Sequence, residues 1–422
     1  MRVELLETLS VGPARGSLFQ GGTVAAKSAL VSWLRSLLLA TVLAAVCVAS
    51  VPARGEHGAK LVGDSISYVA MVHGSSAAPA PFRYRIVVPA IARILPLDPA
   101  RALALVSLLS LVATYALVLR TSRRLGVPDK AAVTGLVTAV CSTPHLYSYE
   151  NPYLTDAMAL LAVSACLHAL VAGRFRWFTA LCVLAMGIRE TSIFAAPAWA
   201  STGQRLRAVL VVTSSLAAYV MIHRFVGPHS ATDPGPFKEF PARPLHDVVA
   251  ELFCAWHGLW FALPAGLLLL PARRREVAGM ACSLCVGTLI TSFLATDTTR
   301  MAAPLFPVIA IGLGAFVATS WKESPVLTAL LAGGSIVSAA LWQPLRSLPH
   351  VTVGSQSWRV LAVTVLAVLG LTGAARLRTR ALGRGGAPAG FRRGALTPTY
   401  AGGPRELSES DARQIVRADA VD

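Results

Sequence analysis

Residues 101–119 read RALALVSLLSLVATYALVL, and after Arg101 this stretch contains no charged side chain. About 20 consecutive apolar residues are needed for a helix to cross the hydrocarbon core of a bilayer, and a run of this length is typical of such a crossing. Comparable apolar runs recur from residue 36 to residue 375, with short polar segments between them. The pattern predicts an all-α polytopic membrane protein.

The composition supports lipid, not water, as the solvent of most of the chain. Of the 422 residues, 55% are hydrophobic and 14% are charged, whereas about a quarter of the residues of a typical soluble domain are charged. A net charge of +17 would suggest nucleic acid in a soluble protein, but the lysines and arginines fall between apolar runs and near the ends of the chain. No aromatic and basic nucleic-acid module is visible. We therefore expect membrane lipids, and no nucleic acid, as partners.

Ten apolar runs are long enough for full crossings. They lie at about residues 36–53, 101–119, 131–147, 157–172, 207–225, 248–270, 277–295, 303–319, 325–342 and 359–375. Two shorter runs, 177–188 and 192–200, flank Arg189 and Glu190 and are each too short to cross comfortably. We expect them to form one short helical hairpin with the charged pair at its apex.

The distribution of basic residues predicts the topology. Lys and Arg accumulate in short cytoplasmic loops, and a cytoplasmic N-terminus places most of the 38 lysines and arginines on that side. Both termini are then cytoplasmic, with a basic leader at 1–35, a multi-helix membrane domain at 36–375 and a flexible tail at 376–422. The outward segments are 54–100, 148–156, 226–247, 296–302 and 343–358. A high content of Ala and Arg favours a bacterial protein, and hence the plasma (inner) membrane.

Motifs for metal or nucleophilic chemistry are absent from the sequence. The seven cysteines lie within or at the ends of apolar runs, where a free cysteine packs as a small hydrophobic residue. There is no HExxH motif, no Walker A loop and no GxSxG elbow. We therefore assign no metal ligands.

The first outward segment contains a carboxylate followed by two arginines: Asp64 lies in a Gly-Asp-Ser turn, and Arg83 and Arg85 follow. In a glycosyl transfer, a carboxylate near the membrane surface accepts the proton of the acceptor hydroxyl, and arginines hold the phosphate of the departing lipid carrier. Asp64 with Arg83 or Arg85 suits these two roles. The alternatives are a helix cap or turn for Asp64 and headgroup binding for the arginines.

The second outward segment is rich in aromatic residues and ends at Asp156, where an apolar run begins. Its aromatic residues suit an interfacial belt, and Asp156 suits the N-terminus of the helix that follows. Aromatic faces and carboxylates also bind sugars, so Tyr153 and Asp156 are equally candidates for a sugar pocket.

Two further pairs of ionisable residues lie on the same side, Arg189 with Glu190 and Asp297 with Arg300. Such residues are costly at a membrane and indicate a functional site by default. Local ion pairs that only close the hairpin or the turn are the alternative. Asp297 and Arg300 add a second carboxylate and guanidinium on the side of Asp64, which favours one shared site.

At these positions the sequence resembles the C-type (GT-C) superfamily of integral membrane glycosyltransferases, which use lipid-phosphate-linked sugars. The resemblance covers roughly residues 30 to 375 and is carried by Gly63-Asp64 with Tyr68, Arg83-Tyr84-Arg85, Asn151-Pro152 with Asp156, Arg189-Glu190, and Asp297 with Arg300. The sequence lacks a paired acidic motif at Asp64 and a large C-terminal outer domain. Metal dependence, a divalent cation included, and acceptor binding are therefore left open.

The resemblance implies inverting transfer of a sugar from a polyprenyl-phosphate carrier to a lipid, glycan or protein hydroxyl on the outer face. It makes Asp64 the general base and Arg83, Arg85 and Arg300 the residues that bind the lipid phosphate. It places Tyr68, Tyr153, Asp156, Arg189, Glu190 and Asp297 around the sugar and acceptor. Two other functions are also compatible with the sequence: a lipid-sugar flippase or other transporter, and a non-catalytic scaffold subunit of a cell-envelope assembly.

Overall fold

The computed structural model describes residues 15–50, 64–75, 78–79, 81–226, 245–270, 273–294 and 298–323, with isolated residues between 325 and 376. All of them belong to the unit Met1–Arg378. Within these ranges every regular element is helical and none is a strand. The elements are α1 (Arg15–Ser50), α2 (Asp64–Val72), the 3₁₀ helix η1 (Phe82–Tyr84), α3 (Val87–Ile94), α4 (Pro99–Arg124), α5 (Asp129–Val140), α6 (Thr143–Glu150), α7 (Asp156–Val171), α8 (Phe175–Met186), the 3₁₀ helix η2 (Glu190–Thr202), α9 (Arg205–Val226), α10 (Leu245–Trp256), the 3₁₀ helix η3 (His257–Phe261), α11 (Ala262–Leu269), α12 (Arg274–Leu294), α13 (Thr298–Ala302), the 3₁₀ helix η4 (Ala303–Leu305) and α14 (Phe306–Glu323).

Five stretches of helix are long and apolar enough to cross a membrane. They are Leu30–Ala49, Pro99–Arg124, Arg205–Val226, Arg274–Phe293 and Arg300–Trp321. Each overlaps one of the ten expected crossings. The all-helical class and the presence of helices of membrane-crossing length are thus confirmed for the described part of the chain.

Three other expected crossings are built from shorter helices. The run at 131–147 is interrupted because α5 ends at Val140 and α6 begins at Thr143. Proline lacks the amide hydrogen that a helix interior needs, and Pro144 occupies the first turn of α6. The run at 248–270 divides among α10, η3 and α11, and the run at 157–172 forms the 16-residue α7.

Several predictions fall on residues outside the described ranges. These are the expected crossings at 325–342 and 359–375 apart from a few single residues, the leader up to residue 14, Asp297, and the tail beyond residue 376. Parts of the outward segments also lie outside the described ranges: residues 54–63 of 54–100, residues 227–244 of 226–247, and the whole of 343–358.

The two half-length runs turn back on each other, as a hairpin requires. The ring of Trp199, near the end of η2, lies 5.2 Å from that of Phe175 and 5.1 Å from that of Phe178, both in the first turns of α8. A 3₁₀ helix rises about 2.0 Å per residue, so the 13 residues of η2 extend about 26 Å. This stretched geometry lets a short run cover nearly the depth of a bilayer core.

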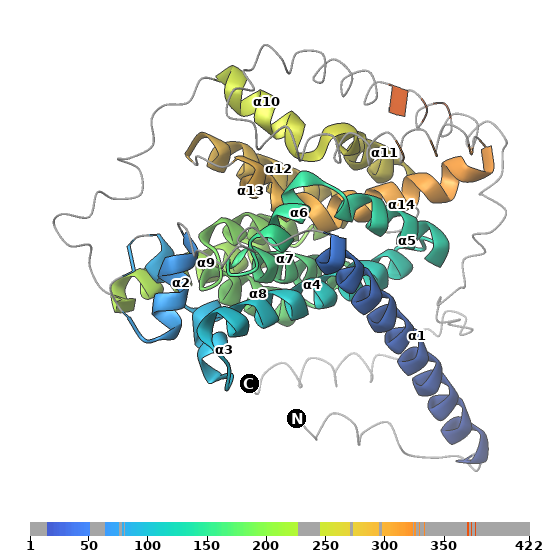
Figure 1. The fold of residues 1–422 in the computed structure, drawn as a ribbon. Coiled ribbons are helices and arrows are strands. Elements are labelled where there is room, and N and C mark those ends of the chain that lie inside the picture. Colours follow the sequence, from blue (N-terminus) through green and yellow to red (C-terminus); the bar gives the residue numbers. More distant parts are fainter. Residues whose placement is uncertain are drawn as a thin grey trace, which may run out of the picture. The chain divides into compact units, whose positions relative to one another are not determined.

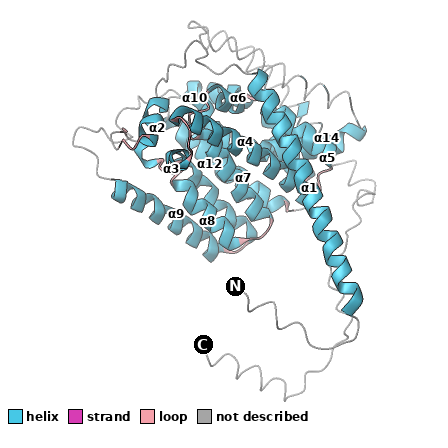
Figure 2. Ribbon diagram, turned by 60° about the horizontal axis from the view of Figure 1, so that its bottom comes forward, coloured by secondary structure: helices cyan, strands magenta, loops and turns pink. Residues whose placement is uncertain are grey.

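The apolar helices differ in how much of their surface the protein itself covers. In the 18-residue apolar window of Arg300–Trp321, 83% of the residues are buried, against 11% in Arg205–Val226. α14 packs against α5 and α11, whereas α9 lies at the side of α8 (Figures 1 and 2). Exposed apolar side chains on α9, such as Leu206 at 83% exposure, face outward. An apolar surface of this extent is stable in contact with lipid.

Small residues let the central helices approach closely. A Cβ atom added at Gly135 of α5 would lie 2.5 Å from the backbone nitrogen of Gly314 and 2.6 Å from the carbonyl oxygen of Ala310, both in α14. Helix pairs in membranes commonly use such small residues, because packing and not the hydrophobic effect holds them together.

We expect Gly135→Ala to destabilise the protein by about 1–3 kcal/mol, because the new methyl group meets backbone atoms that cannot rotate away. Thermal unfolding of the detergent-solubilised protein measures the change. Thr134→Ala, at the exposed neighbouring position, is the control and should leave the melting temperature nearly unchanged. Equal melting temperatures for the two variants would show that this crossing tolerates a wider separation.

Candidate functional site

Two helices begin at acidic residues. Asp64 is the first residue of α2, and Asp156 is the first residue of α7. The positive end of the helix dipole stabilises an anion at this position. The N-cap residue of α7 is Thr155, and no side chain caps this helix through a hydrogen bond. The carboxylate of Asp156 is directed instead to arginines from other segments.

Arg300, in α13, joins the two carboxylates. Its Nη1 donates to Oδ2 of Asp64 at 2.7 Å, while its Nε and Nη2 donate to Oδ2 of Asp156 at 3.1 and 2.9 Å. The guanidinium also lies 5.7 Å from the ring centroid of Tyr147. Asp64 and Asp156, which lie 236 and 144 positions before Arg300 in the sequence, thus bind the same side chain.

Arg189 extends this chain of charges into the protein. It forms an ion pair with Oδ1 of Asp156, and the two side chains are only 2% and 3% exposed. Its Nη2 lies 3.8 Å from the sulfur of Met301. A buried charge without a partner costs several kcal/mol. Asp156 is compensated by both Arg189 and Arg300, whereas Asp156 is the carboxylate with which Arg189 pairs.

Beside this chain lies a second group, made by Arg85, Glu190 and Tyr68. The guanidinium of Arg85 donates two hydrogen bonds to the Glu190 carboxylate, at 3.0 Å from Nε and 2.5 Å from Nη2. Its Nη1 donates to the hydroxyl of Tyr68 at 2.9 Å. Paired bonds of this kind fix the orientation of both groups. They attach the segment after η1 to the apex of the α8–η2 hairpin.

The two groups together hold three carboxylates and three guanidiniums, so their formal charges cancel. We call these six residues the charged network: Asp64, Arg85, Asp156, Arg189, Glu190 and Arg300. Exposure differs sharply within it. Asp64 is 27% exposed, whereas Asp156, which is bound by the same arginine, is 3% exposed. Asp64 is therefore the more accessible carboxylate of this pair.

The pKa of Glu190 reflects its partner. Burial alone would raise the pKa of this carboxyl group, but the Arg85 guanidinium and the hydrogen bonds it donates outweigh burial and lower the pKa from 4.5 to about 2. Glu190 is consequently ionised throughout the physiological range.

This shift predicts how the stability of the Arg85–Glu190 pair depends on pH. Because the folded-state pKa lies below the ordinary value, the pair stabilises the protein fully above about pH 4.5, and the contribution disappears as the pH falls toward 2. We expect Glu190→Gln to lower the melting temperature at pH 7, and we expect this difference from the wild type to shrink below about pH 4.5 and to be lost as the pH approaches 2. Asp98→Asn, which keeps a capping oxygen at an exposed helix start, is the control. A difference between Glu190→Gln and wild type that stays constant from pH 7 to pH 3 would contradict this assignment.

A cavity of about 350 Å³ lies at the C-terminal end of α2, the end opposite Asp64. It is lined by Arg83 and Arg93 and by apolar side chains from α2, α3 and α9, among them Met71, Ile94 and Val226. The cavity and the network share two segments, because α2 carries both Asp64 and Met71 while Arg83 and Arg85 flank Tyr84. An apolar wall with arginines suits a phosphate attached to a hydrocarbon chain.

The structure brings together seven of the ten residues that the sequence singled out. They are Asp64, Tyr68, Arg85, Asp156, Arg189, Glu190 and Arg300. Arg83 lines the neighbouring cavity, and Tyr153 packs against the apolar cluster around Tyr68 and Val72. Asp297 lies outside the described residues.

The three arginines that the sequence singled out for the lipid phosphate have different surroundings. Arg85 and Arg300, expected at the lipid phosphate, are already paired with carboxylates, whereas Arg83 lies on the cavity. The sequence also did not single out Tyr147 and Arg93. Tyr147 is the last residue of the apolar run at 131–147, and Arg93 lies in the first outward segment, so neither position was distinctive in the sequence.

The network does not fit a divalent cation. A cation would need the space between the Asp64 and Asp156 carboxylates, and the Arg300 guanidinium lies there. Across the described residues, no group of three or more His, Cys, Asp or Glu side chains is placed to hold a metal ion.

Comparison of the chain with protein-family models, curated proteins and solved structures yields no match.

Proposed function

We propose that this protein is a membrane glycosyltransferase that moves a sugar from a polyprenyl-phosphate carrier to a hydroxyl acceptor on the outer face of the membrane. The observation that carries the proposal is the Arg300 guanidinium, which holds the exposed Asp64 and the buried Asp156 together at the N-terminal end of α2, while an arginine-lined apolar cavity lies at the other end of this nine-residue helix. A lipid-linked sugar needs this combination of a carboxylate, a phosphate site and an apolar wall.

The proposed topology has ten crossings and one hairpin. The protein lies in the plasma (inner) membrane, and both of its termini are cytoplasmic. The positions of the arginines at the ends of several helices support this topology. The residues of the charged network lie at the starts of α2 and α7 and just after the end of α8. Arg123 and Arg124 lie at the opposite end of α4, Arg174 precedes α8, and Arg274 begins α12. Basic ends of this kind favour the cytoplasmic side.

Asp64 acts as the general base in the proposed reaction. Its carboxylate accepts the proton of the acceptor hydroxyl as the acceptor oxygen bonds to the anomeric carbon. The bond between that carbon and the phosphate oxygen breaks, and polyprenyl phosphate leaves with the electron pair. Arg300 orients Asp64, and Asp156 and Arg189 orient Arg300 from the buried side. Such positioned proton transfer contributes about 10²- to 10⁴-fold to a rate.

Arg83 and Arg93 hold the carrier phosphate in this proposal, and the apolar side chains of the same cavity contact the first part of its hydrocarbon chain. Arg85 stays with Glu190 and keeps the hairpin apex in place. The phosphate role therefore passes from Arg85 and Arg300 to Arg83 and Arg93.

One observation favours transport as a second candidate. The α8–η2 hairpin is a helical element interrupted at the buried Arg189, with Asp156 as its partner. Interrupted helices with buried charges also occur at the substrate sites of transporters. A transporter would move the intact lipid-linked sugar between leaflets and release no polyprenyl phosphate.

The carrier assignment is tested by donor kinetics. We expect Arg83→Gln and Arg93→Gln each to raise the KM for a polyprenyl-phosphate sugar about tenfold, with a smaller change in kcat, because a charge-assisted phosphate contact is lost. Arg101→Gln, an exposed arginine at the start of α4, is the control and should match the wild type. If the KM is unchanged in both cavity variants, the phosphate binds elsewhere.

A further inference from the structure

A second cavity lies at the other end of α4, away from the charged network. It has a volume of about 460 Å³ and is formed between α1 and the C-terminal part of α4. The apolar part is lined by Trp33 and Leu37 of α1 and by Ala113, Ala116 and Leu117 of α4. We call this cavity the α1–α4 groove.

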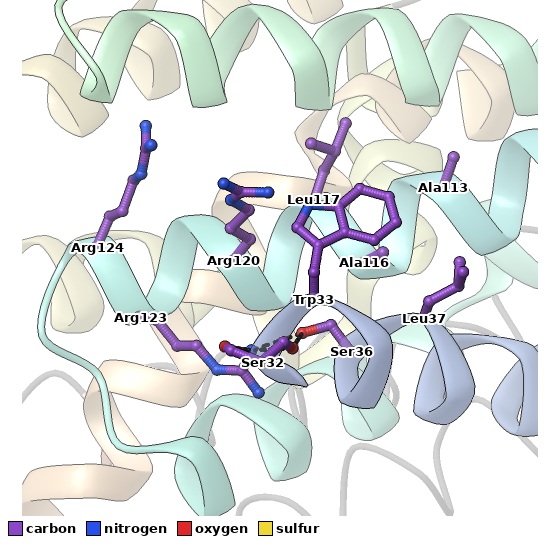
Figure 3. A pocket seen from close by; sticks show the side chains of 10 residues that line it. All are labelled: Ser32, Trp33, Ser36, Leu37, Ala113, Ala116, Leu117, Arg120, Arg123 and Arg124. Atoms are coloured by element: carbon purple, nitrogen blue, oxygen red, sulfur yellow. Dashed lines mark hydrogen bonds between the residues drawn. The ribbon is translucent and has the colours of Figure 1, made fainter. Parts of the chain in front are cut away.

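Three arginines close one end of the groove, and Figure 3 shows that they point in two directions. Arg123 turns toward α1, where its Nη1 donates to the hydroxyls of Ser32 and Ser36 at 3.0 and 2.5 Å. Its Nε donates to the Asp129 carboxylate at 2.6 Å. Arg123 thus connects α4 to α1 and to the start of α5.

Arg120 and Arg124 point to the other side of α4 (Figure 3). They are four residues apart and therefore share one helix face, where two like charges repel. Arg174, before α8, acts on Arg124 as a further neighbouring positive charge. Within the described ranges no carboxylate pairs with Arg120 or Arg124; the contact of Arg120 is with the ring of Trp33, 6.0 Å from its centroid.

The groove is apolar along its length and positively charged at one end, so a ligand that fits it has an apolar part and a negatively charged group. Arginines at the end of a membrane helix generally meet headgroups of any kind without selecting one. Here, however, the charges lie at the mouth of a cavity whose walls come from two helices, and none of the described carboxylates supplies their counter-charge. A soluble phosphate would leave the apolar part of the groove in contact with water.

We propose that the α1–α4 groove binds an anionic phospholipid, with its phosphate at Arg120 and Arg124 and one acyl chain along Trp33, Leu37 and Leu117. The lipid fills the space between α1 and α4 and holds α1 against the rest of the helices. This site is separate from the charged network and does not depend on the transfer reaction.

Native mass spectrometry of the purified full-length protein tests the proposal with two lipid probes that share their acyl chains. We expect dioleoylphosphatidylglycerol to bind at least tenfold more tightly than zwitterionic dioleoylphosphatidylcholine. Arg120→Gln combined with Arg124→Gln should weaken phosphatidylglycerol binding about 10- to 30-fold, since each arginine contributes about 1 kcal/mol near an anionic lipid. Equal affinities of wild type for the two lipids would overturn the proposal.

The control pair is Arg205→Gln with Arg274→Gln, which removes the same charge from two exposed positions outside the groove. This control variant should bind phosphatidylglycerol as tightly as the wild type. If its affinity falls as much as that of the groove variant, the effect is due to overall charge and the proposal is overturned. Ala113→Phe fills the groove and keeps both arginines, so it should also weaken phosphatidylglycerol binding. Size-exclusion profiles identify any variant that misfolds. Displacement of the lipid by glycerol phosphate at equal concentration would mark a soluble-phosphate site and contradict the lipid assignment.

Discussion

Asp64→Asn is expected to lower the rate of sugar transfer about 10²- to 10⁴-fold, with little change in the KM for the donor. The amide keeps the size of the side chain and a hydrogen-bond acceptor for Arg300, but it cannot accept the proton of the acceptor hydroxyl. Steady-state transfer by the purified protein measures both parameters.

Asp98→Asn is the matched control for this experiment. Asp98 also lies in the first outward segment, and its side chain caps α4 through the amides of Ala100 and Arg101. Asparagine caps equally well, so this variant should transfer at the wild-type rate. Asp64→Asn with wild-type kcat would remove Asp64 as the base and transfer the role to another carboxylate, such as Glu190 or Asp297.

Arg189→Met is expected to destabilise the protein by about 1–3 kcal/mol, because Arg300 still compensates part of the Asp156 charge. The substitution leaves the Asp156 carboxylate, 3% exposed, with one fewer positive partner in a buried position. Adding Asp156→Asn to Arg189→Met removes the buried negative charge and should restore part of the loss. Denaturant or thermal unfolding in detergent gives the three values.

Arg273→Met is the comparison for Arg189→Met. Arg273 pairs with Glu276 at 2.9 Å but is 56% exposed. Exposed pairs contribute about 0–1 kcal/mol, so this variant should unfold close to the wild type. If Arg189→Met is as mild as Arg273→Met, the buried chain of charges does not hold the site together.

The positions of the charged network could be predicted because charged residues beside apolar runs are costly and therefore few. Asp64, Asp156 and Glu190 each interrupt or precede such a run. The pairing between them could not be predicted. Arg189 and Glu190 are adjacent and suggest a local ion pair, yet Arg189 has extended backbone angles (φ −161°, ψ 127°) and the two side chains pair with different partners. Those partners lie in segments that only tertiary packing brings near.

The helix boundaries show a similar limit. Hydropathy treats 131–147 as one apolar run, because it does not register that Pro144 ends the hydrogen-bond ladder and starts α6. It also treats 192–200 as too short to cross, because it assumes α-helical rise, whereas η2 is a 3₁₀ helix. Local backbone geometry, which apolar content does not encode, decides both cases.

The most direct test of the transfer reaction is the fate of a polyprenyl-phosphate sugar, labelled in both sugar and lipid, incubated in liposomes with the purified protein and a panel of lipid and glycan acceptors. We expect labelled sugar on an acceptor together with an equal amount of released polyprenyl phosphate. Intact donor that moves between leaflets with no release of polyprenyl phosphate would contradict the account and establish transport instead.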